Sequence, residues 1–261
     1  MASSFWASSQ CDLLLAERER REEREKSSIR ASTTQEIVLG PSRDAESRGA
    51  ARETKGERDY QNKVNDLVDY AVTVGKELKI KERPILTASV YLRRIGRDLL
   101  ESCASGLDRQ ACLSALSCVY LACKVEEVPI SVDKLVAFSK GSHTHQDVLK
   151  EEVRSLRALN ASLIVHHPHN DAKKYASAMG LDKDVLHLLW LVVRDTYKTD
   201  LCLTLPPHII ALGCIYTACA FHGTNALPWC KQNKVEEAEV VQVCAKLVRY
   251  YKRNNAGTNL T

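Results

Sequence analysis

The stretch Ala115–Cys123, ALSCVYLAC, recurs as Ala211–Cys219, ALGCIYTAC, with six of nine positions identical at an offset of 96 residues. Between residues 111 and 123 the only polar side chains, apart from a tyrosine hydroxyl, are Ser114 and Ser117. A helix that is apolar on nearly every side belongs at the centre of a helical bundle. A period near 96 residues is too long for a stacked solenoid, so it predicts two similar helical domains, each built around one buried helix.

The residues around the first copy follow helical periodicity. Apolar residues between Tyr60 and Leu78 recur every three to four positions, as on one face of a helix. Pro84 is placed to begin a second helix, and Asp108 to cap a third over residues 109–126. The run from Thr144 to Asp147 resembles a capping box that opens a helix reaching about residue 160.

Further helices are expected at residues 132–139, 171–179, 183–198, 206–221 and 235–253, with a shorter one near Trp229. No stretch alternates convincingly with period two, which is the pattern of a half-buried strand. The predicted fold class is therefore all-α, with two five-helix domains in tandem and an N-terminal helix.

Composition argues against several classes of protein. The 261 residues are 44% hydrophobic with a formal net charge of +4, a surplus too small and dispersed to indicate nucleic-acid binding. No apolar run approaches the ~20 residues of a membrane span, and the N-terminus lacks the order of a signal peptide. The ten cysteines include no Cys-x-x-Cys pair, which argues against a zinc ribbon or a redox motif.

Motifs for catalysis are also lacking. The sequence has no Gly-x-x-x-x-Gly-Lys phosphate loop and no Gly-x-Ser-x-Gly elbow. The run His166-His167-Pro168-His169 invites a metal interpretation, but zinc usually takes four ligands from separated pairs and no cysteine lies near. We therefore expect no catalytic residue, no metal site and no cofactor.

The N-terminal part of the chain differs from the rest. Residues 17–26 are all charged, five acidic and five basic, as on a solvated helix. Residues 27–57 contain four large aliphatic residues and no aromatic residue, too few to offset the entropy of ordering the segment. The expected organisation is an N-terminal helix (1–26), a disordered linker (27–57), two helical domains (58–163 and 164–253) and a C-terminal tail (254–261).

Five short motifs in the sequence resemble those of a known protein family. They are TASVYLRR (87–94), YLACKVEE (120–127), LIVHHP (163–168), DTYKTDLCL (195–203) and FWASS (5–9). On these motifs the chain resembles the cyclins, and in particular the transcriptional cyclin of the Mediator kinase module. The resemblance implies a tandem cyclin-box fold, no enzymatic activity, and a nuclear protein that binds and activates a cyclin-dependent kinase together with Mediator subunits, without direct nucleic-acid binding.

Helical geometry singles out two charged residues. At 100° per residue, the helix over residues 144–160 has an apolar face that is expected to comprise Val148, Leu149, Val153, Leu156 and Leu159. Glu152 falls inside that face and Glu151 outside it, and a carboxylate in such a place is costly to bury unless it is paired. Lys124 closes the buried third helix, where a cation is favourable against the helix dipole.

The resemblance assigns these residues a role. It implies that Lys124 and Glu152 form a pair that hydrogen-bonds kinase backbone groups, and that Val125, Leu156 and Leu163 supply apolar contact. It also implies that the N-terminal helix, with Trp6, takes part in kinase recognition. On general grounds Lys124 could instead be a plain helix cap, Glu152 an internal structural partner, and both leucines part of the core.

Two other functions stay open. A B-type general transcription factor uses tandem cyclin folds to clasp DNA, but it carries a zinc ribbon, and the net charge from residue 58 onward is only +5. The second alternative is that the chain is a different transcriptional cyclin, one that acts in transcript elongation or processing. The helix at residues 64–70 also lacks the Met-Arg-Ala-Ile-Leu motif that forms the substrate-docking patch of cell-cycle cyclins.

Overall fold

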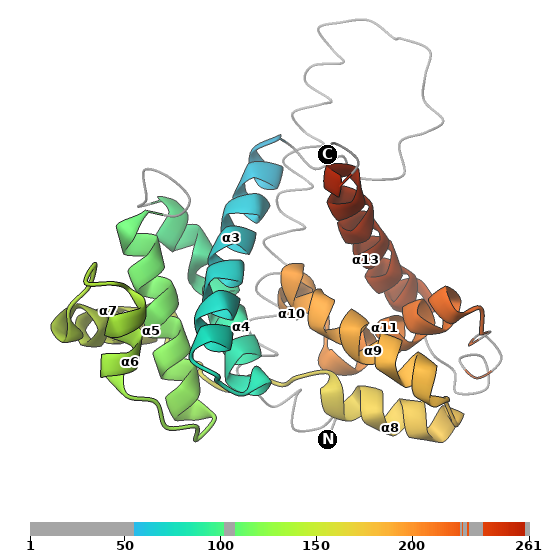
Figure 1. The fold of residues 1–261 in the computed structure, drawn as a ribbon. Helices are drawn as coiled ribbons and strands as arrows, with labels where there is room; N and C mark the ends of the chain where they lie inside the picture. Colours follow the sequence, from blue (N-terminus) through green and yellow to red (C-terminus); the bar gives the residue numbers. More distant parts are fainter. Residues whose placement is uncertain (1–54, 102–107, 225, 227–228, 230–236, 259–261) are drawn as a thin grey trace, which may run out of the picture.

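The computed structural model describes residues 55–101, 108–224, 226, 229 and 237–258. Figure 1 shows these residues as two groups of helices lying side by side. The helices are α3 (Lys55–Glu77), α4 (Glu82–Glu101), α5 (Arg109–Val125), α6 (Val132–Phe138), α7 (His145–Ala158), α8 (His169–Met179), α9 (Lys183–Asp195), η1 (Thr196–Lys198), α10 (Leu201–Thr204), α11 (Pro207–His222) and α13 (Glu237–Thr258).

The described ranges contain no β-strand, so the all-α prediction is confirmed for them. The predicted N-terminal helix and residues 27–54 of the predicted linker lie outside the described residues. Residues 55–57, which the sequence suggested would belong to the linker, form the first turn of α3, and α13 reaches Thr258 inside the predicted tail. The short helix expected near Trp229 lies in a stretch described only at two residues.

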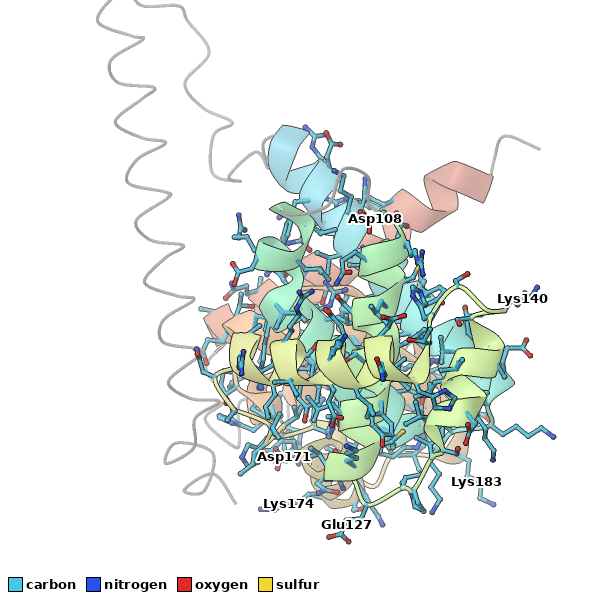
Figure 2. All side chains as sticks on the ribbon, turned by 90° about the vertical axis from the view of Figure 1, so that its left-hand side faces the viewer. Asp108, Glu127, Lys140, Asp171, Lys174 and Lys183 are labelled. Atoms are coloured by element: carbon cyan, nitrogen blue, oxygen red, sulfur yellow. The ribbon has the colours of Figure 1, made fainter. Side chains whose placement is uncertain are left out.

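The first group packs around α5. Eleven consecutive or nearly consecutive side chains of α5 are buried, including Cys118 and Cys123, which confirms that this helix is the core of its group. Asp108 caps it by accepting a hydrogen bond from the backbone N–H of Ala111 at 2.8 Å. Thr144 and Asp147 form the predicted capping box of α7. Figure 2 shows α7 lying across the front of α5, with one side against it and the other facing outward.

The second group repeats this plan around α11. Its buried residues include Cys214 and Cys219, the counterparts of Cys118 and Cys123. Where α5 has Ser117, α11 has Gly213, and a Cβ atom there would lie 2.4 Å from the Val243 side chain of α13. The glycine is therefore required by the close approach of α11 and α13.

The helix predicted over residues 183–198 is interrupted. It ends as α9 at Asp195 and continues as the short 3-10 helix η1, followed by α10, which the sequence did not indicate. The Thr196 hydroxyl donates to the carbonyl of Val193 at 2.6 Å, and the carbonyl of Tyr197 accepts from Arg93 Nε at 2.8 Å. Arg93 belongs to α4 in the first group of helices. Its hydrogen bond therefore links the two groups, and it uses the carbonyl of Tyr197, two residues after α9 ends.

Helix α4 holds the two groups together. Arg93 is 3% exposed and also donates to Asn65 Oδ1 of α3 at 2.6 Å. Its neighbour Arg94 donates to the carbonyl of Ser162, and the Tyr91 hydroxyl donates to the carbonyl of Leu163 at 2.6 Å. The segment that leaves α7 is thus fastened to α4 before it enters the second group.

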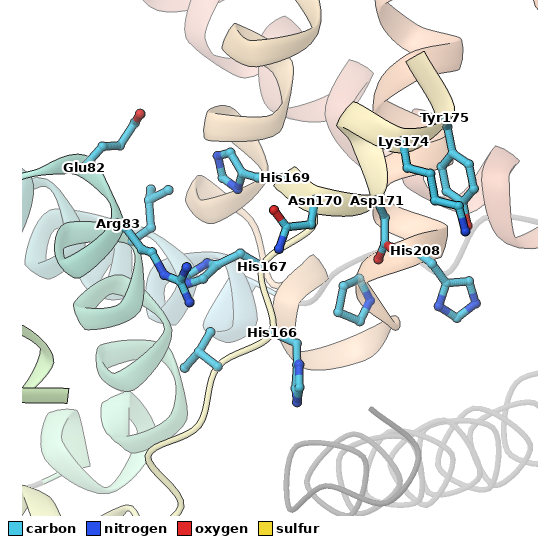
Figure 3. A pocket seen from close by; sticks show the side chains of 13 residues that line it. Glu82, Arg83, His166, His167, His169, Asn170, Asp171, Lys174, Tyr175 and His208 are labelled. Atoms are coloured by element: carbon cyan, nitrogen blue, oxygen red, sulfur yellow. The ribbon is translucent and has the colours of Figure 1, made fainter. Parts of the chain in front are cut away.

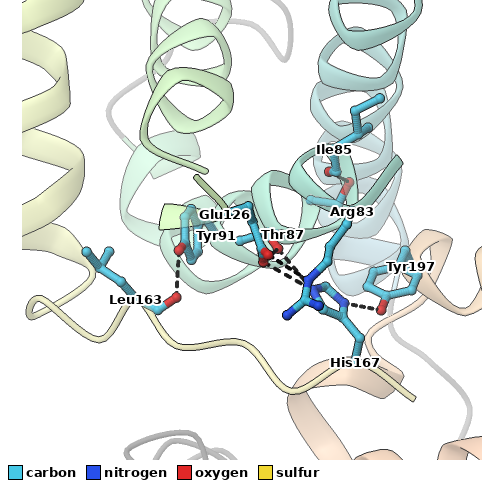
Figure 4. A network of polar contacts seen from close by, with 9 residues as sticks. Arg83, Ile85, Thr87, Tyr91, Glu126, Leu163, His167 and Tyr197 are labelled. Carbon is cyan, nitrogen blue, oxygen red and sulfur yellow. Dashed lines mark hydrogen bonds and ion pairs between the residues drawn. The ribbon is translucent and has the colours of Figure 1, made fainter. Parts of the chain in front are cut away.

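A chain of polar contacts completes the junction (Figure 4). Glu126 lies just after α5. Its Oε2 atom forms an ion pair with Arg83 Nε at 2.6 Å, and its Oε1 atom accepts a hydrogen bond from the Thr87 hydroxyl at 2.7 Å. His167 Nε2 lies 2.9 Å from Thr87 Oγ1, and His167 Nδ1 lies 2.5 Å from the Tyr197 hydroxyl. Because the Thr87 hydroxyl donates to Glu126, Thr87 Oγ1 is left to accept from His167 Nε2, and His167 Nδ1 pairs with the Tyr197 hydroxyl.

The same contacts set the acidity of Glu126. Its pKa is lowered from 4.5 to about 2, first by His167 and then by the hydrogen bond from Thr87 and the charge of Arg83, which together outweigh the effect of burial. A carboxyl group whose pKa is depressed by folding stabilises the folded state above its unfolded pKa. That stabilisation is lost as the pH falls through the folded pKa.

Glu126→Gln should therefore lower the free energy of unfolding by about 2–3 kcal/mol at pH 7. The difference from the parent chain should shrink as the pH falls from about 4.5 to about 2, where Glu126 is protonated in both states. Urea unfolding at several pH values, followed by circular dichroism, measures it. Glu127→Gln, at the exposed neighbouring position, is the control, and an equal, pH-independent loss in both variants would contradict the assignment.

Among the described residues, no helix combines the length and hydropathy that crossing a membrane requires.

Candidate functional site

An ion pair lies at the surface where α5 ends. Lys124 is in the last turn of α5, and its Nζ lies 2.7 Å from Oε1 and 3.0 Å from Oε2 of Glu152 in the middle of α7. The Lys124 side chain is 48% exposed and that of Glu152 is 15% exposed. The sequence-predicted residues Lys124 and Glu152 are therefore brought together, with the lysine end of the pair open to solvent.

The surroundings keep Lys124 charged. Burial lowers its pKa, but the hydrogen bond and negative charge of Glu152 and the nearby Tyr120 outweigh this, so the pKa is raised. Nζ also lies 4.3 Å from the centre of the Tyr120 ring, a cation–π distance. The pair is held in place on α5 and α7, and because the Lys124 side chain is 48% exposed, a remaining N–H of its ammonium group can bind a carbonyl group of a partner.

The inward face of α7 differs from the predicted one. The side chains buried against the first group are Val148, Glu151, Ser155 and Leu159. Glu151, predicted to lie outside the packed face, is 6% exposed and accepts from the Ser114 hydroxyl at 2.5 Å and from Gln110 Nε2 at 2.9 Å. The prediction for Glu151 was wrong because α5 presents polar groups to α7 at this point.

Two of the five residues of the predicted apolar face are turned outward, whereas Val148 and Leu159 are buried as predicted. Leu149 is 43% exposed and Val153 is 46% exposed, so the prediction that they belong to the packed face was wrong. Leu156 is half-buried. Leu149, Glu152, Val153 and Leu156 are spaced three and four residues apart, and they share one outward face of α7. We call the surface formed by these four residues with Lys124 and Val125 the α5–α7 surface.

The remaining predicted contact residues are placed as follows. Val125 is half-buried beside Lys124. Leu163 is half-buried, packs against the core of the first group, and has its carbonyl held by Tyr91. Ile164, which the sequence analysis did not select, is 61% exposed just after it. Trp6 lies outside the described residues.

Sequence reasoning missed Leu149, Val153 and Tyr120 as residues of the site. A signal for the first two was available, because Ser114 and Ser117 are the only polar side chains in the central part of α5. Ser114 bonds Glu151, and the Ser117 and Ser155 hydroxyls lie 3.4 Å apart. A helix that packs on those serines turns Glu151 and Ser155 inward, which leaves Leu149 and Val153 on the outward side.

The histidine run has other partners than a metal. His167 belongs to the junction network, and the His169 ring stacks on Trp190 with the ring centres 6.1 Å apart. In the part of the chain that the structure describes, no group of three or more His, Cys, Asp or Glu side chains is arranged to hold a metal ion.

Two similar helical groups, each around a buried helix, with a lysine–glutamate pair at the exposed end of the first such helix, define a protein of the tandem cyclin-box class. A family model described as "Cyclin, N-terminal domain" matches residues 47–164. The chain belongs to the cyclin family.

Within that family, the chain is similar in sequence to several proteins named cyclin C. The chain is 32% identical over 196 residues to Cyclin-C of Rattus norvegicus, covering 69% of this chain and 68% of the relative. It is 30% identical over 200 residues to Cyclin-C1-2 of Arabidopsis thaliana, covering 74% and 77%. Among solved structures, a chain of the yeast TFIIK (Kin28/Ccl1/Tfb3) complex superposes with a TM-score of 0.56 at 19% identity, covering 79% of this chain and 98% of that one. This last likeness concerns the fold.

Replacing Glu151 and replacing Glu152 should change the free energy of unfolding by different amounts. Glu151→Ala should lower the free energy of unfolding by about 1–3 kcal/mol, because it leaves the buried Ser114 hydroxyl and the half-buried Gln110 amide without their acceptor. Glu152→Ala should lower it by less than about 1 kcal/mol, because Lys124 can turn to solvent. Urea unfolding of both variants measures this, and an equal loss in the two would refute the separation.

Proposed function

We propose that this chain is a non-catalytic regulatory subunit that binds and activates a cyclin-dependent kinase acting in RNA polymerase II transcription. The observation that carries the proposal is the α5–α7 surface, where the Lys124–Glu152 pair stands beside exposed apolar side chains. Membership of the cyclin family supports it, because cyclins are regulatory subunits rather than enzymes.

The α5–α7 surface has the make-up of a protein interface. Leu149 and Val153 offer apolar area next to a charged pair that is already formed in the free chain. Burying the apolar residues supplies binding free energy, and the pair fixes register, since its removal leaves a partner's polar groups without contact. Val125, Leu156 and Leu163 extend the apolar contact, and Trp6 adds a contact from the N-terminal helix.

The activating effect follows from what a rigid surface does to a mobile helix. A cyclin-dependent kinase needs the ion pair between its strand lysine and the glutamate of its regulatory helix before phosphoryl transfer can proceed. A partner that binds only the active position of that helix shifts the kinase toward it. Because α7 is anchored on the buried helix α5 through Glu151, it can present such a surface without rearranging.

The same proposal extends to the complex and the cell compartment in which the chain acts. The relatives named cyclin C support a place in the kinase module of Mediator, with Mediator subunits as further partners and the nucleus as the location. Affinity purification of the full chain with mass spectrometry tests this. Recovery of a kinase together with Mediator subunits is expected, and recovery of a kinase with other transcription complexes only would overturn the Mediator assignment.

Removal of either member of the pair should weaken kinase binding. For Lys124→Ala and for Glu152→Ala we expect a loss of about 2–5 kcal/mol, because each leaves the other charge unpaired in a partly dry interface. Isothermal titration calorimetry with the co-purified kinase measures it, and kinase activity at saturating cyclin reports activation. Lys134→Ala, an exposed lysine on α6, is the control. Unchanged binding by both variants would remove this assignment.

The outward apolar residues of α7 give a sharper test. Leu149→Glu and Val153→Glu should each weaken kinase binding about 10- to 100-fold, equivalent to about 1.4–2.8 kcal/mol, by placing a charge in an apolar contact. Both side chains are exposed in the free chain, so the melting temperature should hardly change. Val241→Glu, at a more exposed valine of α13, is the matched control. If all three variants bind alike, the α5–α7 surface is not the interface.

A further inference from the structure

The fixed charges that line the cleft between the two helical groups balance. Arg83 lies on one side of this cleft and Lys174 on the other (Figure 3). The carboxylates of Glu82 and Asp171 line it too, and Arg83 is already paired with Glu126. Electrostatics therefore give the cleft no preference for a cation or an anion. Helix α13, by contrast, carries an arrangement of residues that does select a partner.

Three large hydrophobic side chains are exposed on α11 and α13. Val241 and Val248 of α13 are 62% and 38% exposed, and Phe221, near the end of α11, is 57% exposed. Figure 1 shows α13 at the edge of the second group. Exposed apolar side chains that gather on neighbouring elements indicate a surface for a partner, whereas single ones need no such explanation.

The two valines lie on one side of α13. Val240, Val243 and Leu247 face the core of the second group. Val241 and Val248 lie roughly 110° around the helix from the centre of that buried face. They are seven residues apart, which corresponds to two turns and about 10 Å along the helix axis.

A small residue and two charged residues complete this side of the helix. Ala245 is half-buried between the valines, and a side chain of this size lets a second helix approach closely. Glu237 precedes Val241 by four residues, and Lys252 follows Val248 by four. Spacings of three and four residues keep these positions on the same side of a helix. We call the positions 237, 241, 245, 248 and 252 the α13 face.

The α13 face complements itself when its direction is reversed. The pair Val241 and Val248 and the pair Glu237 and Lys252 share one midpoint, between residues 244 and 245. A two-fold axis at that midpoint therefore places position 241 of one copy opposite position 248 of the other, and position 237 opposite position 252. Parallel helices would instead place each charge opposite its like, which is unfavourable. A second copy of this chain is the partner that carries the matching order of residues.

The described residues leave this face open at its basic end. The Lys252 side chain is exposed and forms no ion pair with another residue that the structure describes. Phe221 packs edge-on against Tyr251, with the ring centres 5.7 Å apart. Since Tyr251 is three residues from Val248, Phe221 extends the apolar area at that end of the α13 face.

We propose that the chain self-associates through the α13 face as an antiparallel dimer with two-fold symmetry. The valines and Phe221 supply the apolar area, and the two Glu237–Lys252 pairs set direction and register. Because the apolar area is small and exposed ion pairs contribute little, the dimer is weak, with a dissociation constant on the order of tens of micromolar. The proposal goes beyond kinase activation and does not depend on it, since the α13 face shares no residue with the α5–α7 surface.

Sedimentation velocity with the full chain tests for the dimer. Between about 1 and about 300 µM, the sedimentation coefficient should rise from that of a monomer toward that of a dimer. Val248→Glu should weaken association at least about tenfold, because the symmetry places two new charges in the apolar contact. Lys173→Glu, at an exposed lysine of α8, is the control and should associate like the parent chain.

An exchange of charges tests the register. Lys252→Glu and Glu237→Lys should each weaken association about tenfold, because each places like charges opposite one another twice in the dimer. The variant that carries both changes restores opposite charges and should associate to within about twofold of the parent chain. Lys252 is exposed, so these charge variants decide the outcome if Val248→Glu fails to fold.

Three results would overturn the proposal. They are a parent chain that stays monomeric up to about 300 µM, a double variant as weak as the single ones, and a loss in Lys173→Glu as large as that in Lys252→Glu. The first would leave the α13 face to residues 1–54 of the same chain or to a different protein. Val241→Glu should lose self-association and still bind the kinase like the parent chain, so a failure of either proposal is seen separately.

Discussion

The structure depends on the burial of one helix on all its sides. Because α5 is apolar around almost its whole circumference, the helices α3, α4 and α7 must pack around it, and α11 imposes the same arrangement on the second group. A helix enclosed in this way reaches the surface only at its ends. Lys124 stands at such an end, so the constraint that builds the core also determines where the charged pair of the α5–α7 surface is displayed.

Polar contacts then fix what burial leaves undetermined. Hydrophobic burial has no direction, so it does not by itself set the register between two groups of helices. Here α4 supplies that register through Arg93, which bonds the carbonyl of Tyr197, and through Tyr91 and Arg94, which hold the segment after α7. The network of Glu126, Thr87 and His167 adds donors and acceptors that are matched one to one.

Helix α7 shows how one element serves the core and the surface at once. Its inner face carries Glu151 and Ser155 toward the serines of α5, so hydrogen bonds anchor it together with the buried side chains of Val148 and Leu159. This leaves Leu149 and Val153 for the outer face, beside Glu152. A helix that turned all of its apolar residues inward would have none left for a partner. The polar anchoring of α7 is thus the physical basis of the proposed interface, and the apolar area is available without any rearrangement.

The order and approximate bounds of the helices, the all-α class, the internal repeat and the caps at Asp108 and Thr144 could be predicted from the sequence, because periodicity and capping are local properties of the chain. The pairing of Lys124 with Glu152 was implied by family resemblance and not by spacing. The face of α7 that packs inward, the break after Asp195 and the short helix α10 were decided only by the tertiary structure. In each case the deciding partner, such as Ser114 for Glu151 or Arg93 for Tyr197, lies far away in the sequence, and no local pattern records which side of a helix will meet it.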